Sequence, residues 1–188
     1  MAKEKLLLVG AGGLGRVTSE IARQSFDCAF LDDGVPAGRQ VCGIPVIGTT
    51  GELEALFGEY RKLVVSIGNN PLRERLYRRA AEIGYAFPNV VAPSAYVSPY
   101  AAVGGGCIIL QHAVIQNGAA VGDGAILNPG VEIHHDSTLG NYVLIYTNSV
   151  VRTLAQVGDR AHIGSTLTIG NRAVIEPDEV VPDGQTRR

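Results

Sequence analysis

The sequence predicts a chain of two parts, a small parallel α/β domain followed by a parallel β-helix. A six-residue repeat that runs from Val97 to Val181 predicts the β-helix. Before the repeat, strand patterns alternate with helical patterns, and a glycine-rich loop follows the first of these strands. Such alternation is typical of a parallel α/β sheet. We expect the α/β domain over residues 1–88 and the β-helix over residues 89–188.

The six-residue repeat keeps its register throughout. Every sixth position from Val97 is Val, Ile or Leu, and the residue two positions earlier is usually Ala, Ser or Cys. This period is typical of a parallel β-helix in which three hexapeptides form one triangular coil. Glycine recurs every third hexapeptide, which we interpret as a corner that needs a tight or left-handed backbone; the positions are Gly104, Gly122, Gly140 and Gly158. The alternative, an antiparallel sandwich, requires no such spacing.

The first 88 residues carry the α/β elements. Apolar runs predict strands over residues 5–10, 28–31, 41–47, 62–67 and 85–87. The strand over 41–47 is expected at the sheet edge, because Pro45 cannot donate to a central ladder. Helices are expected after the glycine loop, after a capping box formed by Thr49 and Glu52, and from Pro71 to Ile83. Helices should cover both faces of the sheet.

The composition indicates a globular protein, with 46% hydrophobic and 18% charged residues. A net charge of −2 gives no sign of a nucleic-acid or membrane surface. No signal peptide and no membrane-spanning pattern stands out, so we expect a cytoplasmic protein. The cysteines lack paired spacing and fall on strand-like stretches, which predicts buried thiols in a reducing compartment; they are Cys28, Cys42 and Cys107.

The glycine-rich loop is the first candidate for binding. Gly10, Gly12 and Gly15 form the pattern G-x-G-x-x-G between a predicted strand and a predicted helix. This pattern can hold a phosphate at the helix N-terminus. A dinucleotide, a nucleotide sugar and a purely structural loop are all compatible with it, but the second half of a dinucleotide-binding domain is missing. Asp32 and Asp33 end the next strand, where ligands bind in open α/β sheets, although a solvated turn could carry the same residues.

Histidine is the candidate for proton transfer. His135 is followed by Asp136 at a predicted turn. A carboxylate against one ring nitrogen fixes the tautomer and stabilises the imidazolium that forms when the ring accepts a proton. His134 should point away from His135, and His162 should point outward. A corner histidine with no catalytic role is the alternative for each of them.

These motifs together resemble the sialic acid O-acetyltransferase family, which includes UDP-amino-sugar N-acetyltransferases of bacterial glycan pathways. The motifs are the G-A-G-G-x-G loop, an L-D-D turn, a V-x-I-G-N-N-x-x-R segment, and hexapeptide coils with a histidine–acid turn. The resemblance covers nearly the whole chain. It implies a left-handed β-helix, a homotrimer, and acetyl-CoA bound along the coils between subunits. It also implies a UDP-sugar held by the N-terminal domain over the histidine of a neighbouring subunit.

The resemblance also implies roles for individual residues. The catalytic histidine falls on His135 and its acidic helper on Asp136. Thr153, through its backbone amide, would face the acetyl carbonyl, and Ile163 and Gly164 would also contact acetyl-CoA. The positions that contact the nucleotide sugar fall on Gly12, Gly13, Leu14, Asp32, Asp33, Gly68, Asn69 and Arg73.

One residue and one three-residue segment depart from the family pattern. Leu14 stands where relatives usually carry a histidine, and residues 176–178 (Glu-Pro-Asp) replace a Gly-Ala-Gly corner near the coenzyme. The second departure leaves open a protein that binds nucleotide sugars without catalysis. A carbonic-anhydrase-like zinc enzyme is a further alternative, since it uses the same coil, but it needs three converging histidines. We predict no metal site.

The leading prediction is an acetyl-CoA-dependent acetyltransferase that acts on an amino or hydroxyl group of a nucleotide-linked sugar. A trimer would also cover outward apolar residues, for which Tyr146 and Leu144 are the examples.

Overall fold

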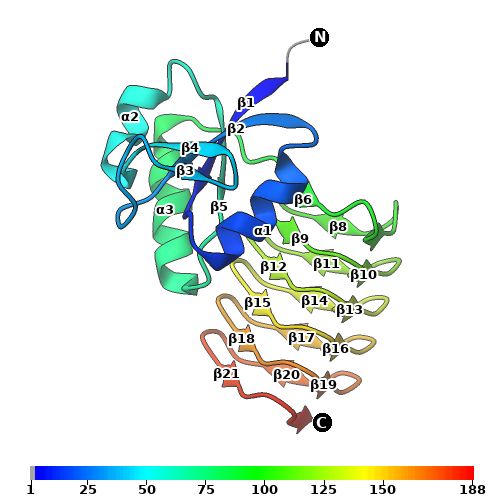
Figure 1. The fold of residues 1–188 in the computed structure, drawn as a ribbon. Coiled ribbons are helices and arrows are strands. Elements are labelled where there is room, and N and C mark those ends of the chain that lie inside the picture. The colour runs from blue at the N-terminus through cyan, green and yellow to red at the C-terminus, as the bar shows by residue number, and fades with distance from the viewer. Residues whose placement is uncertain (1–2) are drawn as a thin grey trace. The chain divides into compact units, whose positions relative to one another are not determined.

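The computed structural model describes residues 3–188. The chain separates into two compact units, Met1–Val90 and Val91–Arg188. Figure 1 shows the elements of both.

The first unit is a five-stranded sheet with helices. Its strand order is β3-β4-β2-β1-β5, and every pairing is parallel except β3 with β4. The elements are β1 (Glu4–Val9), α1 (Gly13–Ala22), β2 (Phe26–Leu31), β3 (Gln40–Val41), β4 (Ile44–Gly48), the 3₁₀ helix η1 (Thr50–Glu52), α2 (Leu53–Leu56), β5 (Lys62–Val65) and α3 (Asn70–Ile83).

Strand β1 lies at the centre of this sheet, and its apolar run explains the position. Leu6, Leu7 and Leu8 are fully buried although their side chains alternate between the two faces. A strand that is buried on both faces reads as a continuous apolar run in the sequence. The chain leaves β1 toward β2 on one side and returns later to β5 on the other. The loops after β1 and β5 therefore meet at the point where ligands bind in open α/β sheets.

Two predicted strands differ from the structure. The segment 41–47 is a hairpin, since β3 and β4 are joined at Cys42 and Gly43, whose φ angles are 52° and 73°. Two residues with positive φ are typical of a tight hairpin turn. Cys42 is therefore exposed, which corrects the prediction that all three cysteines are buried. The strand predicted over 85–87 is a single bridge between Ala86 and Lys62.

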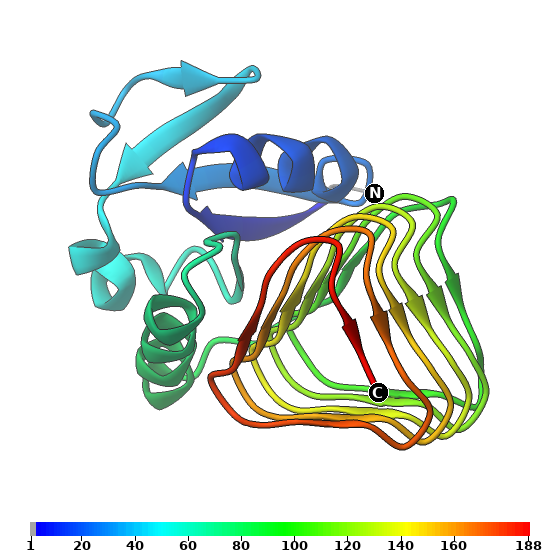
Figure 2. The same cartoon turned by 90° about the horizontal axis from the view of Figure 1, so that it is seen from below.

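The second unit is the predicted β-helix. Three parallel sheets have the orders β22-β19-β16-β13-β10-β7, β20-β17-β14-β11-β8 and β21-β18-β15-β12-β9-β6. The view along the axis in Figure 2 shows the triangular coils. The strands are β6 (Val90–Val91), β7 (Tyr96–Val97), β8 (Ala102–Val103), β9 (Ile108–Ile109), β10 (Val114–Ile115), β11 (Ala120–Val121), β12 (Ile126–Leu127), β13 (Glu132–Ile133), β14 (Thr138–Leu139), β15 (Leu144–Ile145), β16 (Val150–Val151), β17 (Gln156–Val157), β18 (His162–Ile163), β19 (Thr168–Ile169), β20 (Val174–Ile175), β21 (Val180–Val181) and β22 (Thr186–Arg187).

The core of the β-helix consists of the repeating aliphatic residues and the small residues before them. Every repeat position is buried except Val97 and Val103, which belong to the first coil and are only partly covered. Each strand pairs with the strand one coil further along. For example, β10 pairs with β13, which places Ile115 beside Ile133. This confirms the fold class, a small α/β domain followed by a left-handed parallel β-helix.

The recurring glycines are explained by close packing between coils. A Cβ atom on Gly122 would lie 2.6 Å from the carbonyl carbon of Gly140 in the next coil. The residues with a left-handed backbone lie two positions after this column of glycines, one in each coil. They are Gly106, Gly124, Tyr142, Arg160 and Asp178. The predicted tight or left-handed corner is therefore two separate positions, a close approach at Gly122 and a left-handed backbone at Gly124.

The last coils are regular despite the unusual Glu-Pro-Asp corner at 176–178. Asp178 takes the left-handed conformation (φ 63°) of that column. Its carboxylate accepts a hydrogen bond from Nε of Arg160 at 2.7 Å, one coil earlier, which holds the pKa of Asp178 below its usual value. The departure from the family pattern therefore leaves the fold intact.

Surface features bear on two other expectations. Leu144 is only 2% exposed, so it adds no apolar area for a trimer to cover, whereas Tyr146 is partly exposed as predicted.

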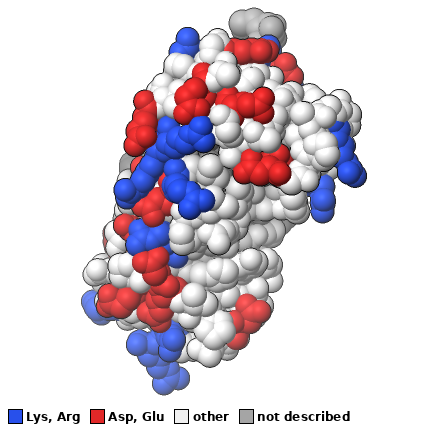
Figure 3. All heavy atoms as spheres, turned by 90° about the vertical axis from the view of Figure 1, so that its left-hand side faces the viewer, with Lys and Arg blue, Asp and Glu red and all other residues white. Residues whose placement is uncertain are grey.

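Positive and negative side chains are interspersed on the face shown in Figure 3. Among the described helices, none is long and apolar enough to cross a membrane.

Candidate active site

The strongest candidate for chemistry is the corner that carries His135 and Asp136. Nδ1 of His135 lies 2.8 Å from Oδ2 of Asp136. Nε2 of the same ring lies 3.1 Å from the hydroxyl oxygen of Thr153, which occupies the equivalent place one coil further along. The side chains of His135 and Asp136 are 55% and 57% exposed, so a substrate can reach them.

These contacts define the protonation of the neutral ring. An ionised carboxylate can only accept hydrogen bonds, so the proton of neutral His135 lies on Nδ1 and is donated to Asp136. Nε2 then carries the free lone pair and acts as the acceptor. The Thr153 hydroxyl donates to that lone pair. This is the arrangement that a general base requires, with the basic nitrogen directed away from its carboxylate partner.

The local backbone holds this corner in place. Asp136 is left-handed (φ 59°), a conformation that Asp tolerates better than most residues. The N–H of Asp136 donates to the carbonyl of Asn117 at 3.3 Å. The N–H of His135 donates to the side-chain oxygen of Gln116 at 3.1 Å, one coil earlier. The preceding coil therefore holds the backbone of the histidine–acid pair in place.

Thr153 offers a second group to the site. Its carbonyl accepts a hydrogen bond from the N–H of Arg172. Its own N–H has no partner among residues 3–188. An unpaired N–H one strand spacing from His135, about 4.8 Å along the axis, can stabilise negative charge that develops on a carbonyl oxygen.

The other histidines have different surroundings. Nε2 of His134 lies 3.4 Å from a carboxylate oxygen of Glu132. The ring of His162 packs against Tyr146 at a centroid distance of 5.2 Å, so it is a partly buried residue of the coil face. Within the described part of the chain, no group of three or more His, Cys, Asp or Glu could hold a metal ion.

The α/β unit contains a pocket of about 500 Å³ at the carboxyl ends of its strands. It is lined by groups from the loops after β1, β2 and β5 and from α3. Of the predicted binding residues, it includes Asp32 and Asp33. Gly12, Gly13, Leu14, Gly68 and Asn69 are outside its lining.

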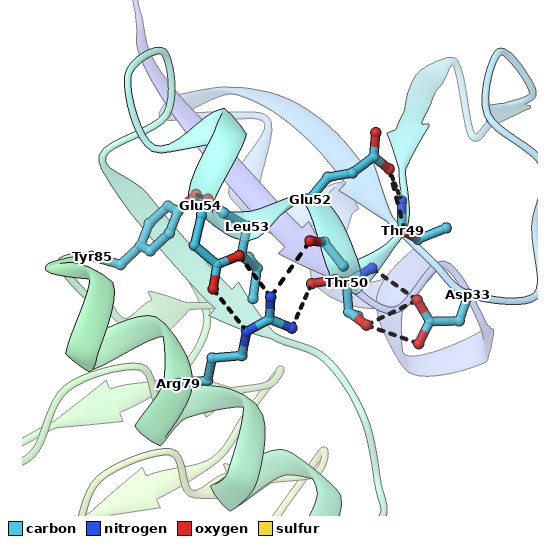
Figure 4. Close-up of polar contacts among 9 residues, drawn as sticks. Asp33, Thr49, Thr50, Glu52, Leu53, Glu54, Arg79 and Tyr85 are labelled. Atoms are coloured by element: carbon cyan, nitrogen blue, oxygen red, sulfur yellow. Dashed lines mark hydrogen bonds and ion pairs between the residues drawn. The ribbon is translucent and has the colours of Figure 1, made fainter.

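Asp32 and Asp33 both organise the loops around this pocket. The Asp32 carboxylate accepts hydrogen bonds from the N–H groups of Ala11, Gly34 and Val35 at 2.7, 2.8 and 2.9 Å. The Asp33 carboxylate accepts from the N–H and the hydroxyl of Thr50 (Figure 4). These carboxylates therefore connect the loops after β1, β2 and β4, a structural role that no local pattern in the sequence indicates.

The arginines of α3 differ from the prediction. Arg73 is fully buried, and its guanidinium donates to the carbonyl of Ile67, so it supports the loop after β5 from the inside. The side chain of Arg73 therefore has no exposed surface in this structure. Arg75 and Arg79 line the pocket instead. Their four-residue spacing puts them on one helix face together with Leu72 and Leu76, and this spacing was the signal available in the sequence.

Arg79 is tied to the segment after β4. Its guanidinium donates to Glu54 and to the carbonyl of Thr50 (Figure 4), and the pairing holds the pKa of Glu54 below its usual value. Figure 4 also shows the predicted capping box, in which the Glu52 carboxylate accepts from the N–H of Thr49. The side chain of Arg75 has no hydrogen bond or ion pair with any residue in the 3–188 range, which leaves its charge available at the pocket.

The glycine loop has two distinct parts. Gly10 (φ 100°) and Gly15 are required by the fold, because a Cβ atom on Gly15 would lie 1.9 Å from the carbonyl oxygen of Gly10. Gly12 and Gly13 are exposed at the start of α1, and a Cβ atom on either would meet nothing within 4 Å. Their backbone N–H groups are accessible, as a phosphate would need. Gly68 and Asn69 are also exposed, and Asn69 caps α3 by accepting from the N–H of Leu72.

The other two residues predicted to bind coenzyme A have no free group. The Ile163 side chain is fully buried in the β-helix core. The N–H of Gly164 donates to Val181, and its carbonyl accepts from the hydroxyl of Ser149. Of the three residues, Thr153 presents an unpaired backbone N–H.

Comparison with known proteins agrees with this architecture. The family profile described as PglD N-terminal domain matches residues 5–80. The acetyltransferase domain of PglB from Neisseria gonorrhoeae FA1090 has 31% sequence identity and a TM-score of 0.92, over 98% of this chain and 91% of that one. The chain belongs to the bacterial sugar N-acetyltransferases of the hexapeptide-repeat type. This membership confirms the predicted family and the assignment of the chain as an acetyltransferase.

Other members of this sugar N-acetyltransferase family show similar agreement. PerB from Caulobacter crescentus, solved with CoA and GDP-perosamine, has 30% identity and a TM-score of 0.80, over 98% of this chain and 94% of that one. A GDP-perosamine N-acetyltransferase of Escherichia coli O157:H7 is 28% identical over 86% of this chain and 76% of its own length. The PglB domain has also been solved with acetyl coenzyme A.

Proposed function

We propose that this sugar N-acetyltransferase moves the acetyl group of acetyl-CoA to the amino group of a nucleotide-linked amino sugar, with His135 as the general base. The observation that carries the proposal is the pair of contacts on one ring, Asp136 at Nδ1 and Thr153 at Nε2. In this role Asp136 holds the tautomer, and the Thr153 N–H faces the acetyl carbonyl.

The reaction places specific demands on these residues. The C–N bond forms when the amine attacks the thioester carbonyl, and the nitrogen loses a proton to Nε2 of His135. The imidazolium that results is stabilised by Asp136. Negative charge grows on the carbonyl oxygen, and the unpaired N–H of Thr153 donates to it. The C–S bond then breaks, and the thiolate of CoA takes the proton from His135.

Acetyl-CoA fits the donor groups of this corner. The site offers a base and an unpaired amide one coil apart, which are the two groups that a thioester carbonyl needs near it. Relatives of the same fold have been solved with acetyl coenzyme A or CoA, which supports the same donor here.

The acceptor sugar would be held through its nucleotide by the α/β domain, residues 1–88, and the chemistry would belong to the β-helix domain, residues 89–188. The pocket beside Asp32 and Asp33 has the size of a small-ligand site, and Arg75 provides positive charge for a diphosphate. The exposed backbone of Gly12 and Gly13 is a second group for phosphate. Leu14, Gly68 and Asn69 would contribute at the rim.

The nucleotide is proposed to be uridine diphosphate. Guanosine diphosphate is the second candidate, because PerB was solved with GDP-perosamine. We also propose a cytoplasmic homotrimer. Exposed apolar side chains on the coils support an assembly that covers them; they are Tyr96, Tyr100, Val174 and Val180.

Titration calorimetry tests the substrates separately. We expect acetyl-CoA to bind, and UDP to bind more tightly than GDP. Tighter binding of GDP would replace uridine by guanosine in the proposal. Absence of acetyl-CoA binding at millimolar protein and ligand would contradict the acetyl donor. Light scattering at micromolar protein should give the mass of a trimer, and a stable monomer would contradict the assembly.

A further inference from the structure

The side chain of Thr153 makes a contact that the proposed mechanism does not use. The mechanism needs the backbone N–H of Thr153, yet the hydroxyl oxygen of the same residue lies 3.1 Å from Nε2 of His135. This distance is within the range of a hydrogen bond. The base nitrogen of the free protein therefore already has a donor.

Both nitrogens of the ring are thus engaged. The Asp136 carboxylate takes the proton of Nδ1, and the Thr153 hydroxyl donates to Nε2. The ring is more than half exposed, so packing alone does not fix its rotation. Free histidine can exchange between two neutral tautomers. The Asp136 carboxylate selects the tautomer, because it can only accept, and the two partners on opposite edges together select one ring orientation.

Thr153 is suited to this task by its shape and its place. A β-branched side chain has few χ1 rotamers, so its hydroxyl is held in a narrow range of directions. The residue lies one coil beyond His135, and its carbonyl is fixed by the N–H of Arg172. Its hydroxyl therefore reaches the ring from a rigid backbone.

We propose that Thr153 is a positioning residue whose hydroxyl donates to the unprotonated Nε2 of His135, fixes the rotation of the ring, and aims that nitrogen at the place where the substrate amine arrives. This inference rests on the proposed role of His135 as the base. The amine N–H replaces the hydroxyl as the donor to Nε2 when the acceptor sugar binds. The hydroxyl thus keeps the base in its reactive orientation between turnovers.

The test compares three variants of the whole chain. Thr153→Val keeps the branched shape and removes the hydroxyl, and Thr153→Ser keeps the hydroxyl. Thr147→Val is the matched control. Thr147 occupies the same turn position one hexapeptide earlier, before the left-handed Asn148, and its carbonyl likewise accepts from the next coil, at Thr166. Equal melting temperatures of the variants and the wild type show that each has folded.

The first measurement needs no substrate. Nitrogen-15 NMR of the imidazole reports which nitrogen carries the proton and whether the other accepts a hydrogen bond. We expect His135 of the wild type and of Thr153→Ser to carry its proton on Nδ1 with a hydrogen-bonded Nε2. In Thr153→Val the Nε2 signal should shift toward that of an unbonded nitrogen. Identical Nε2 signals in the wild type and Thr153→Val would overturn the inference.

The second measurement is steady-state acetyl transfer. We expect Thr153→Val to lower kcat about tenfold, because a misaligned base loses part of its orientation, with KM for both substrates within about twofold. Thr153→Ser should restore kcat to within about threefold, and Thr147→Val should match the wild type. Unchanged kcat in Thr153→Val overturns the inference. His135→Ala separates the two claims: if that variant keeps its turnover, the proposed base itself is wrong, whereas a loss only in His135→Ala rejects Thr153 alone.

Discussion

Asp136 reaches Nδ1 of His135 from the very next position in the chain, at 2.8 Å. Adjacent side chains in an extended strand point to opposite faces. Here the contact forms because Asp136 is left-handed (φ 59°) and the pair lies at a coil corner. A histidine–acid pair is thus built from two neighbouring residues, with the stacked coils fixing both.

The first prediction concerns the acid. Asp136→Asn keeps the size of the side chain and tolerates the left-handed backbone. Its amide can donate to Nδ1, which would leave the proton of the ring on Nε2, the wrong nitrogen for a base. We expect kcat to fall by about 10², less than the roughly 10⁴ known for a buried triad, because this pair is exposed. Steady-state kinetics with saturating acetyl-CoA measures the change.

The control for the acid is Asp178→Asn. Asp178 is also left-handed and exposed, at another corner, and it pairs with Arg160. We expect its kcat to equal that of the wild type. Full turnover in Asp136→Asn, or an equal loss in the two variants, would show that Asp136 does not set the tautomer.

The second prediction concerns the glycine loop. Gly15→Ala would place a methyl group 1.9 Å from the carbonyl oxygen of Gly10, so the strand end and the helix must separate. We expect the free energy of unfolding to fall by about 1–3 kcal/mol, as for other overpacked sites. Gly13→Ala is the control, since its methyl group meets nothing within 4 Å. Denaturant unfolding of both variants should show a loss for Gly15→Ala only. Equal stability of the two would mean that the close approach at Gly15 is not present in solution.

The third prediction concerns the pocket. Arg75→Ala removes a charge that lines the pocket and has no partner among the residues described. We expect the Kd for the nucleotide diphosphate to rise about tenfold, the effect of losing one charge-assisted hydrogen bond of about 1.5 kcal/mol. Arg78 lies on the same helix, α3, about one turn after Arg75. It is outside this pocket and pairs with Glu74 on the surface. Arg78→Ala should leave the Kd unchanged. Similar Kd values for the two variants would place the diphosphate elsewhere.

The β-helix could be predicted in detail because its sequence signal is periodic. Each coil repeats the same local geometry, so one inward aliphatic position, such as Ile145, implies the next at Ile163. The same register placed His135 and Asp136 at a turn, since a turn must come two residues after an inward position, and the family resemblance gave the pair its expected catalytic role. The contact between His135 and Thr153 was within reach, because the two are one coil apart.

The α/β unit was harder to predict because its binding groups depend on tertiary contacts. Nothing in the sequence distinguishes Arg73, which is buried, from Arg75, which lines the pocket, except helical spacing relative to Leu72 and Leu76. Asp32 was expected at a strand end that binds a ligand, or in a solvated turn, but its carboxylate accepts hydrogen bonds from three backbone N–H groups in two loops. Such contacts bring together residues that are far apart in the chain, so local sequence patterns do not predict them.

The central claim is that His135 is the base for acetyl transfer to a sugar amine. The most direct measurement is the turnover of His135→Ala beside His134→Ala, with acetyl-CoA and a nucleotide-linked amino sugar. We predict that His135→Ala lowers kcat by about 10² to 10⁴, the range for loss of a general base, while the affinity for the nucleotide sugar stays the same. His134→Ala, whose ring is paired with Glu132, should keep nearly full activity. Full turnover in His135→Ala, or an equal loss in both variants, would contradict the account.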